Sequence, residues 1–188
     1  AAGAIRVTTP TELVEVARFL SCAPLPRGRR VAVVSDSGGQ GGVAADVSFS
    51  LGLDTPVLSP ELQATLSELL PAGAAVANPV DLAGAGESDL QTYARICELL
   101  VESGEVDAVL VSGYLGCYGE DTPSLEAAEV AVVDRLGALV ERCDLPLVVH
   151  TMSAGSVAVD RMWEHHIPTY GSVEQALRAV ARARELDQ

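Results

Sequence analysis

The sequence predicts an α/β protein in which helices cover both faces of a parallel, doubly wound β-sheet. Short runs of β-branched and other apolar residues, such as residues 31–34 and 106–113, alternate with longer segments whose apolar residues recur at helical spacing. The chain has 188 residues, of which 48% are hydrophobic and 20% charged, which is enough for one sizeable core. Strands that alternate with helices in this way form a parallel sheet, because each crossover returns the chain in the same direction.

The chain opens with a helix predicted over residues 10–20 and capped by Thr9. Its predicted apolar face consists of Leu13, Val16, Ala17 and Leu20. The following "SCAPLPRG" contains two prolines and a glycine, which indicates a linker. We therefore expect an N-terminal helical arm over residues 1–28 and one α/β domain over residues 29–188.

Five strands are expected in this domain, over residues 31–34, 53–59, 106–113, 145–151 and 167–170. Helices are expected over residues 42–51, 60–70, 88–102, 124–142, 155–166 and 172–186, with an extended connection over 75–82. This alternation suggests a flavodoxin-like sheet of order 2-1-3-4-5 in a three-layer αβα arrangement. Such sheets bind ligands at the carboxyl ends of their strands, beside the switch point between strands 1 and 3. Those ends carry the loops at 35–42 and 113–123.

Composition excludes several classes of function. The net charge of −14 argues against a nucleic-acid-binding protein. All twelve basic residues are arginine, which excludes a lysine nucleophile, a Schiff base and a P-loop lysine. No secretion signal and no apolar run of about 20 residues is visible, so we expect a cytoplasmic protein without a membrane span. The cysteines match no metal-binding spacing and are expected to be reduced and mostly buried: Cys22, Cys97, Cys117 and Cys143.

The stretch "VAVVSDSGGQGGVAAD" at residues 31–46 predicts an anion site. Its candidate residues are Ser35, Asp36, Ser37, Gly38, Gly39, Gln40, Gly41 and Gly42. The glycines are expected to allow positive φ and close approach of the backbone, and they lead into a helix N-terminus, which favours an anion. Their GGxGG spacing is neither the dinucleotide GxGxxG nor a Walker A motif. A tight turn without a ligand is the alternative.

Further candidates lie on other segments. Asn78 and Asp81, in "NPVD", are expected either to support the glycine-rich loop and touch a ligand or to form a rigid connector. The glycine- and tyrosine-containing loop at 113–123 suits a lid or docking surface, with simple tyrosine packing as the alternative. His150 ends a predicted strand at the functional edge of the sheet. His165 and His166 are interpreted as a surface pair near a helix end, and no metal site is expected.

Several of these segments resemble one family. "VAVVSDSGGQGGVAAD" is similar to the "VAIVTNAGGPGVLAAD" type of segment in NDP-forming acyl-CoA synthetases, which belong to the succinyl-CoA synthetase superfamily. "NPVDLAG" at 78–84 resembles the Asn-Pro-Val-Asp that follows in those proteins. The segments at 2–20, 106–113 and 145–183 fit in the same order, so the likeness covers nearly the whole chain.

The resemblance implies a flavodoxin-like CoA-ligase domain. In this family acyl-CoA, ADP and phosphate yield the acid, ATP and CoA, and the phosphoryl group passes through a histidine. The loop from Ser35 to Gly42 matches a helix start that faces this phosphohistidine. The resemblance implies no catalytic residue in this chain and no tightly bound cofactor, because phosphate, CoA and ADP or ATP belong to the larger enzyme. Its CoA-binding and ATP-grasp domains or subunits are the implied partners.

The chain departs from the family at some points. Its 188 residues contain no Ser-His-Thr-Gly segment, and Asp36 stands where Asn is usual, which places a negative charge near the expected phosphate. The alternative function is a non-catalytic ligand-sensing or interaction domain of a synthetase-like protein, such as a fused protein acetyltransferase. A flavin-binding flavodoxin is disfavoured because the chain has only four Tyr, two Phe and one Trp. The acyl group, the nucleotide and a homodimer are left open.

Overall fold

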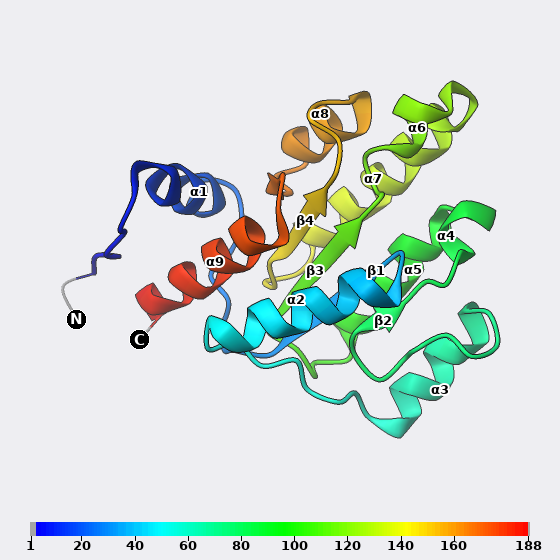
Figure 1. Cartoon of the computed structure of the whole chain (residues 1–188), viewed down its shortest axis with the longest axis horizontal. Coiled ribbons are helices and arrows are strands. Elements are labelled where there is room, and N and C mark those ends of the chain that lie inside the picture. The colour runs from blue at the N-terminus through cyan, green and yellow to red at the C-terminus, as the bar shows by residue number, and fades with distance from the viewer. Residues whose placement is uncertain (1–2, 188) are drawn as a thin grey trace.

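Five parallel strands form one sheet of order β2-β1-β3-β4-β5 in the computed structural model, which describes residues 3–187 (Figure 1). The strands are β1 (Val31–Ser35), β2 (Val80–Asp81), β3 (Ala108–Gly113), β4 (Leu147–Thr151) and β5 (Thr169–Tyr170). The predicted α/β class, strand order and three-layer arrangement are confirmed. Residues 1–2 of the predicted arm and residue 188 of the predicted domain lie outside the described residues.

The second strand differs from the prediction in its position in the sequence. It is Val80–Asp81, which lies in the predicted connection, whereas residues 53–59 form one isolated bridge to the chain before β1. The side chain of Asn78 accepts a hydrogen bond from the amide of Val33 at 2.9 Å and donates to the carbonyl of Val31 at 2.9 Å. These groups lie on the edge of β1, so a side chain takes the pairing positions that a longer second strand would use.

The helices follow the predicted order with shifted ends. They are α1 (Pro10–Leu20), α2 (Gly38–Ser50), α3 (Pro60–Leu69), α4 (Ala85–Ser88), α5 (Gln91–Glu102), α6 (Tyr118–Asp121), α7 (Glu126–Glu141), α8 (Val157–Glu164) and α9 (Val173–Ala183). Short 3₁₀ turns cover Pro123–Leu125 and Arg184–Asp187. The predicted helix over 88–102 corresponds to α5, the short helices α4 and α6 were not predicted, and α2 begins four residues before its predicted start.

Helices cover both faces of the sheet (Figure 1). On one face α2 and α9 enclose strand residues such as Val33 and Leu110, and α1 lies outside α9. On the other face α3, α5, α7 and α8 enclose Val34 and Val111. The alternation of strand side chains between two apolar layers explains why the strands read as continuous hydrophobic runs. Because the strands are parallel, all their carboxyl ends meet at one edge, where β1 leads into the start of α2.

Helix α1 docks on α9 through buried charged residues. Arg182 donates to Glu12 at 2.7 Å and Arg178 to Glu15 at 3.3 Å. Both glutamates are buried, at 2% and 5% exposure, beside the fully buried Phe19. Each carboxylate has lost much of its water, and its arginine partner offsets the free-energy cost of burying the charge.

The predicted apolar face of α1 is therefore wrong in most of its residues. Only Val16 of that set is buried, whereas Leu13 is 56% exposed, Leu20 is 38% exposed and Ala17 is exposed. Apolar spacing alone predicted that the face with more aliphatic residues packs against the domain. The face that carries the glutamates packs instead, because its carboxylates bind the arginines of α9. The division into an arm and a domain stays a prediction.

Replacing Glu12 by glutamine is expected to lower the free energy of unfolding by about 1 kcal/mol at about pH 7. Hydrogen bonds from Thr8 and then from Arg182 lower the pKa of Glu12 to about 2. A depressed pKa means that the ionised carboxylate stabilises the fold. The difference should therefore be complete above the ordinary pKa of 4.5 and shrink as the pH falls towards 2.

Urea denaturation of Glu12→Gln and of the wild type at several pH values measures this difference. Glu68, an exposed glutamate of α3, provides the matched control, and Glu68→Gln should change stability little at any pH. A Glu12→Gln effect of constant size down to about pH 2 would contradict the role of the ionised carboxylate.

Candidate functional site

The glycine-rich segment is the first turn of a helix rather than a loop. Ser37 is the N-cap of α2, and its side chain accepts a hydrogen bond from the amide of Gln40 at 3.4 Å. Among the described residues the positive-φ glycines do not include Gly38, Gly39, Gly41 or Gly42. The expectation of positive φ is therefore wrong, because these glycines already have helical backbone conformation.

The glycines of α2 act instead by leaving out side chains. A Cβ at Gly41 would lie 2.9 Å from Pro79 and 3.0 Å from Ser35 Oγ, so this glycine lets the helix approach the segment before β2 closely. A Cβ at Gly39 or Gly42 would meet nothing within 4 Å, and both residues are exposed. The first amides of an α-helix have no intrahelical partner, so the bare start of α2 is suited to an anion.

Acidic side chains surround this helix start. Asp36 accepts a hydrogen bond from the amide of Tyr114, which follows β3. Burial is the main cause that raises the pKa of Asp36 to about 6, the Tyr114 amide opposes it, and the charges of Glu87 and Asp81 add to it. Asp81 accepts a hydrogen bond from the Ala83 amide at 2.9 Å and lies 3.2 Å from where a Gly38 Cβ would be. The structure thus places Asp36 and Asp81 beside the start of α2.

Asn78 and His150 do not join this group. The side chain of Asn78 bonds to the backbone of β1, as described above, and acts as a connector. His150 Nδ1 lies 2.9 Å from Ser112 Oγ, on β4, which is separated from β1 by β3. Burial lowers the pKa of His150, and the charge of Glu174 opposes this shift. Ser35, also a candidate, is fully buried and donates to the carbonyl of Ser37 at 2.8 Å, so it shapes the turn from inside.

A buried glutamate, which no sequence pattern indicated, organises the segment after β3. The carboxylate of Glu129, on α7, accepts hydrogen bonds from the amides of Gly116 at 2.7 Å, Tyr118 at 3.2 Å and Gly119 at 2.9 Å. Its exposure is 1%. Glu129 lies in the helix predicted over 124–142 among other acidic residues, and nothing in that pattern distinguishes a buried glutamate from an exposed one. The segment is a fixed turn with α6, and Tyr118 is buried against Tyr93.

The remaining histidines and cysteines have structural surroundings. His165 Nε2 lies 2.9 Å from Asp134, and its ring fills the space that a side chain at Gly137 would need. His166 is exposed just beyond the end of α8. All four cysteines are free; Cys97 and Cys117 are buried, and the other two are half-buried. Burial raises the pKa of the Cys97 thiol to about 12 and also raises that of Cys117, which disfavours a reactive thiolate at either position.

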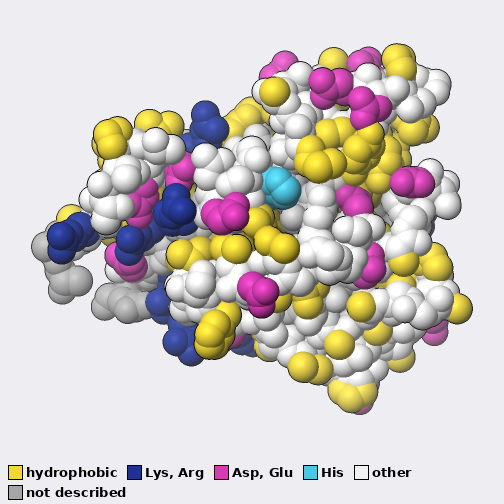
Figure 2. Space-filling model, in the orientation of Figure 1, with side chains coloured by type: hydrophobic (Ala, Val, Ile, Leu, Met, Phe, Trp, Pro, Cys, Tyr) yellow, Lys and Arg dark blue, Asp and Glu magenta, His cyan; other side chains and the backbone are white. Residues whose placement is uncertain are grey.

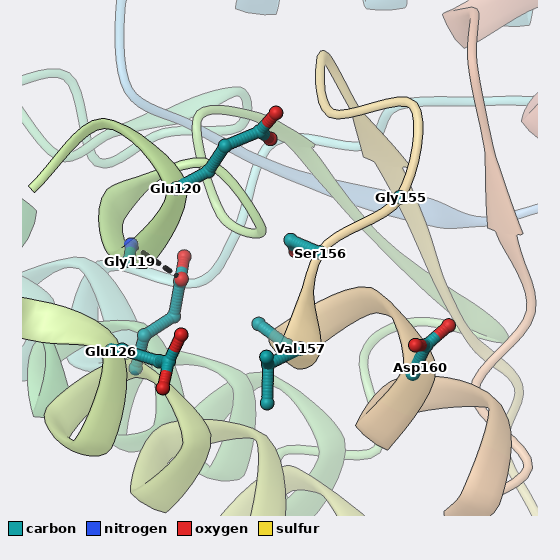
Figure 3. Close-up of a pocket in the computed structure, with 9 residues that line it drawn as sticks. Gly119, Glu120, Glu126, Gly155, Ser156, Val157 and Asp160 are labelled. Carbon is teal, nitrogen blue, oxygen red and sulfur yellow. Dashed lines mark hydrogen bonds between the residues drawn. The ribbon is translucent and has the colours of Figure 1, made fainter. Parts of the chain in front are cut away.

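A pocket of about 320 Å³ lies between the starts of α7 and α8. Figure 3 shows Glu126, Val157 and Asp160 around it, and Glu120 also lines it. Its walls are acidic, so it does not suit a phosphate, and none of its lining residues belongs to α2. Figure 2 shows that arginine side chains gather around α1 and α9, whereas on the opposite half of this face the charged side chains in view are acidic. The bare start of α2 therefore offers an anion its backbone amides rather than basic side chains.

The family assignment rests on a comparison that covers most of the chain. The model described as "Ligase-CoA domain" matches residues 31–185. The chain belongs to the Ligase-CoA domain family. The matched region of this Ligase-CoA domain contains the whole sheet, the start of α2 and every residue of the candidate site.

Curated relatives of this Ligase-CoA domain are named as a CoA synthase or as CoA ligases. It is 28% identical over 191 residues to "Trans-feruloyl-CoA synthase FCS1" from an unknown prokaryotic organism, which covers 99% of this chain and 26% of the relative. It is 29% identical over 180 residues to "Acetate--CoA ligase [ADP-forming] II subunit alpha" of Pyrococcus furiosus, with coverage of 94% and 38%. The chain thus spans less than half the length of these relatives.

Solved structures share the fold of this Ligase-CoA domain. PH0766 from Pyrococcus horikoshii OT3 is 26% identical with a TM-score of 0.76, over 98% of this chain and 41% of that one. The dinucleotide-forming acetyl-coenzyme A synthetase 1 of Ca. Korarchaeum cryptofilum, in complex with phosphate and ADP, has a TM-score of 0.76 at 21% identity, over 98% and 40%. The second likeness shows the fold alone. Within residues 3–187, no helix is both long and apolar enough to cross a membrane.

Proposed function

We propose that this chain is the second flavodoxin-like ligase domain of a larger NDP-forming acyl-CoA synthetase, called the parent enzyme below. The parent enzyme would convert acyl-CoA, ADP and phosphate to the acid, ATP and CoA through a phosphohistidine. In this proposal the first turn of α2, with the amides of Gly38 and Gly39, binds the phosphohistidine or phosphate. The chain contributes no catalytic side chain and is inactive alone.

The proposal assigns the other requirements of the reaction to other parts of the parent enzyme. CoA-binding and ATP-grasp domains or subunits are the partners of this chain. Phosphate, CoA and ADP or ATP are ligands of the parent enzyme and not tightly bound cofactors of this domain. A cytoplasmic location belongs to the same proposal. Membership of the Ligase-CoA domain family and relatives named as ADP-forming CoA ligases support it.

One observation carries the phosphate role, namely the exposed and side-chain-free start of α2. A helix N-terminus carries a partial positive charge of about one half, and its free amides point at an anion. The backbone can therefore bind a phosphate without lysine, which this chain lacks. Gly39 leaves open space on the exposed side of the first turn of α2, so a phosphorylated side chain of another domain can approach the backbone closely there.

The variant Gly39→Asp tests this role because it adds a negative charge at the start of α2. We expect it to weaken sulfate or phosphate binding at least tenfold, a change of about 1.4 kcal/mol. Gly42→Asp is the matched control, since it adds the same charge one turn further along and also enters open space. Anion binding is measured from the amide NMR shifts of residues 38 and 39, which both keep their backbone amide in the two variants. Equal weakening by both variants, or no response of these amides to the anion, would contradict the proposal.

The parent enzyme provides the second test. With a panel of acyl-CoAs, ADP and phosphate, the wild type should form ATP, and Gly39→Asp should lose most of this activity while Gly42→Asp keeps it. A parent that forms no ATP with any member of the panel would favour the alternative, a non-catalytic sensing domain.

A further inference from the structure

Two buried oxygen atoms at the switch point have no hydrogen-bond partner among the described residues. They are Asp36 Oδ1 and Gln40 Oε1. Both side chains lie over Gly113, where an added Cβ would collide with the Asp36 carboxylate and with Gln40 Oε1. The other carboxylate oxygen of Asp36 already accepts from the amide of Tyr114. Two neighbouring buried acceptors that have no donor between them are unfavourable. One hydrogen atom between Asp36 and Gln40 Oε1 would satisfy both.

We propose that Asp36 binds a proton that it donates to Gln40 Oε1, and that this proton switches the anion site at the start of α2. With the proton, the pair is neutral and fully hydrogen-bonded, and the site binds its anion. Without the proton, a carboxylate faces the anion and Gln40 Oε1 loses its donor. This inference rests on the anion site proposed above and names what regulates it.

The charged groups around Asp36 favour the protonated form. Asp81, at the end of β2, and Glu87, in α4, act on its carboxylate, and both are acidic. Tyr118, in α6, is the third titratable group near Asp36, and it is buried. On α2 itself, the neutral side chain of Gln40 lies beside Asp36 over Gly113. Burial together with the two acidic neighbours raises the pKa of Asp36 to about 6, which places the switch within a physiological range.

Asparagine at this position would satisfy the same two partners permanently. Its side-chain oxygen would accept from the Tyr114 amide and its amide group would donate to Gln40 Oε1, with no charge at any pH. A protonated aspartic acid has the same shape and the same donor and acceptor pattern. Asp36 therefore keeps the geometry of an asparagine while adding a dependence on pH.

The test is an NMR titration of the 188-residue chain, with sulfate as the anion because its charge stays constant across the range used. The ¹³C signal of the Asp36 carboxyl group, identified by its loss in Asp36→Asn, should titrate with a midpoint near the pKa of about 6. The amide signals of Gly38 and Gly39 report sulfate. We expect binding to be at least tenfold tighter at about pH 5 than at about pH 8. In Asp36→Asn binding should differ less than twofold between these two pH values.

Asp81→Asn is the matched control, because Asp81 is the other carboxylate beside the helix start. It should keep the tenfold pH dependence of sulfate binding even if affinity rises at both pH values. A midpoint of Asp36 below its ordinary pKa of 3.8 would overturn the proposal, and would fit a rotated Gln40 amide that donates to the carboxylate. The same tenfold dependence in Asp36→Asn would also overturn it.

The sulfate titration separates this inference from the proposed function. Sulfate binding of equal strength at both pH values contradicts the switch and leaves the anion site intact. Absence of sulfate binding in the wild type and in Asp36→Asn at either pH contradicts the anion site, and with it the switch.

Discussion

Replacing Glu129 by alanine is expected to lower the free energy of unfolding by about 3–5 kcal/mol. The Glu129 carboxylate is buried and accepts hydrogen bonds from three backbone amides, those of Gly116, Tyr118 and Gly119. Hydrogen bonds to a charged acceptor are worth more than neutral ones, and their loss leaves three donors in buried residues without a partner. The turn after β3 should loosen first, because these bonds hold its backbone to α7.

Urea denaturation measures this loss, with Glu126→Ala as the control. Glu126 lies one turn earlier on α7 and is exposed. Its substitution by alanine removes the same negative charge and should lower the free energy of unfolding by less than about 1 kcal/mol. Similar losses in both variants would show that net charge, and not the hydrogen bonds of Glu129, determines the effect. Glu129→Gln should fall between them, because its amide group places a donor against one of the three backbone donors.

Replacing Gly113 by alanine is expected to destabilise the fold by about 3 kcal/mol, the sum of backbone strain and steric overlap. Gly113 ends β3 with φ +136°, a backbone conformation that residues other than glycine rarely adopt. A Cβ at this position would also collide with Asp36 and Gln40. Both side chains must then move from the switch point. Sulfate binding at the start of α2 should lose its pH dependence, because the Asp36–Gln40 pair no longer forms.

Gly104→Ala separates strain from collision. Gly104 also has positive φ, at +68°, but a Cβ there would meet nothing within 4 Å. Its substitution should therefore cost about 1 kcal/mol, the strain alone. Thermal or urea unfolding of the two variants gives both values. If Gly113→Ala proves no more harmful than Gly104→Ala, the close contact of Asp36 and Gln40 with Gly113 is wrong.

Much of the fold followed from local patterns. The runs at 31–34, 106–113 and 145–151 are apolar on both faces. This pattern is typical of strands that helices cover on both sides. Strand 2 was assigned to the wrong segment because β2 has two residues, Val80–Asp81, too few to show a pattern. The edge of β1 is completed by the Asn78 side chain, and a contact between residues 45 positions apart leaves no local trace.

The candidate site was predictable in outline. Glycine spacing and the carboxyl edge of the sheet predicted a loop over 35–42 that leads into a helix, whereas Ser37 already caps α2 and Gly38 and Gly39 lie in its first turn. The roles of the glycines could not be predicted, because the close approach of a backbone depends on what lies opposite, such as Pro79 beside Gly41. His150 shared the correct edge of the sheet but lies beyond β3, so edge position alone did not select the residues of the site.

The sequence by itself determined the α/β class, the order of the strands and the presence of a glycine-rich segment that leads into a helix after the first strand, because these depend on periodicity and on which residues adjoin in the chain. Tertiary structure alone decided which face of α1 packs, that Glu129 is buried, and that Asp36 and Gln40 meet over Gly113. These features depend on contacts between distant segments. The effect of an aspartate on a phosphate site depends on its burial and its partners, and only the folded chain supplies both.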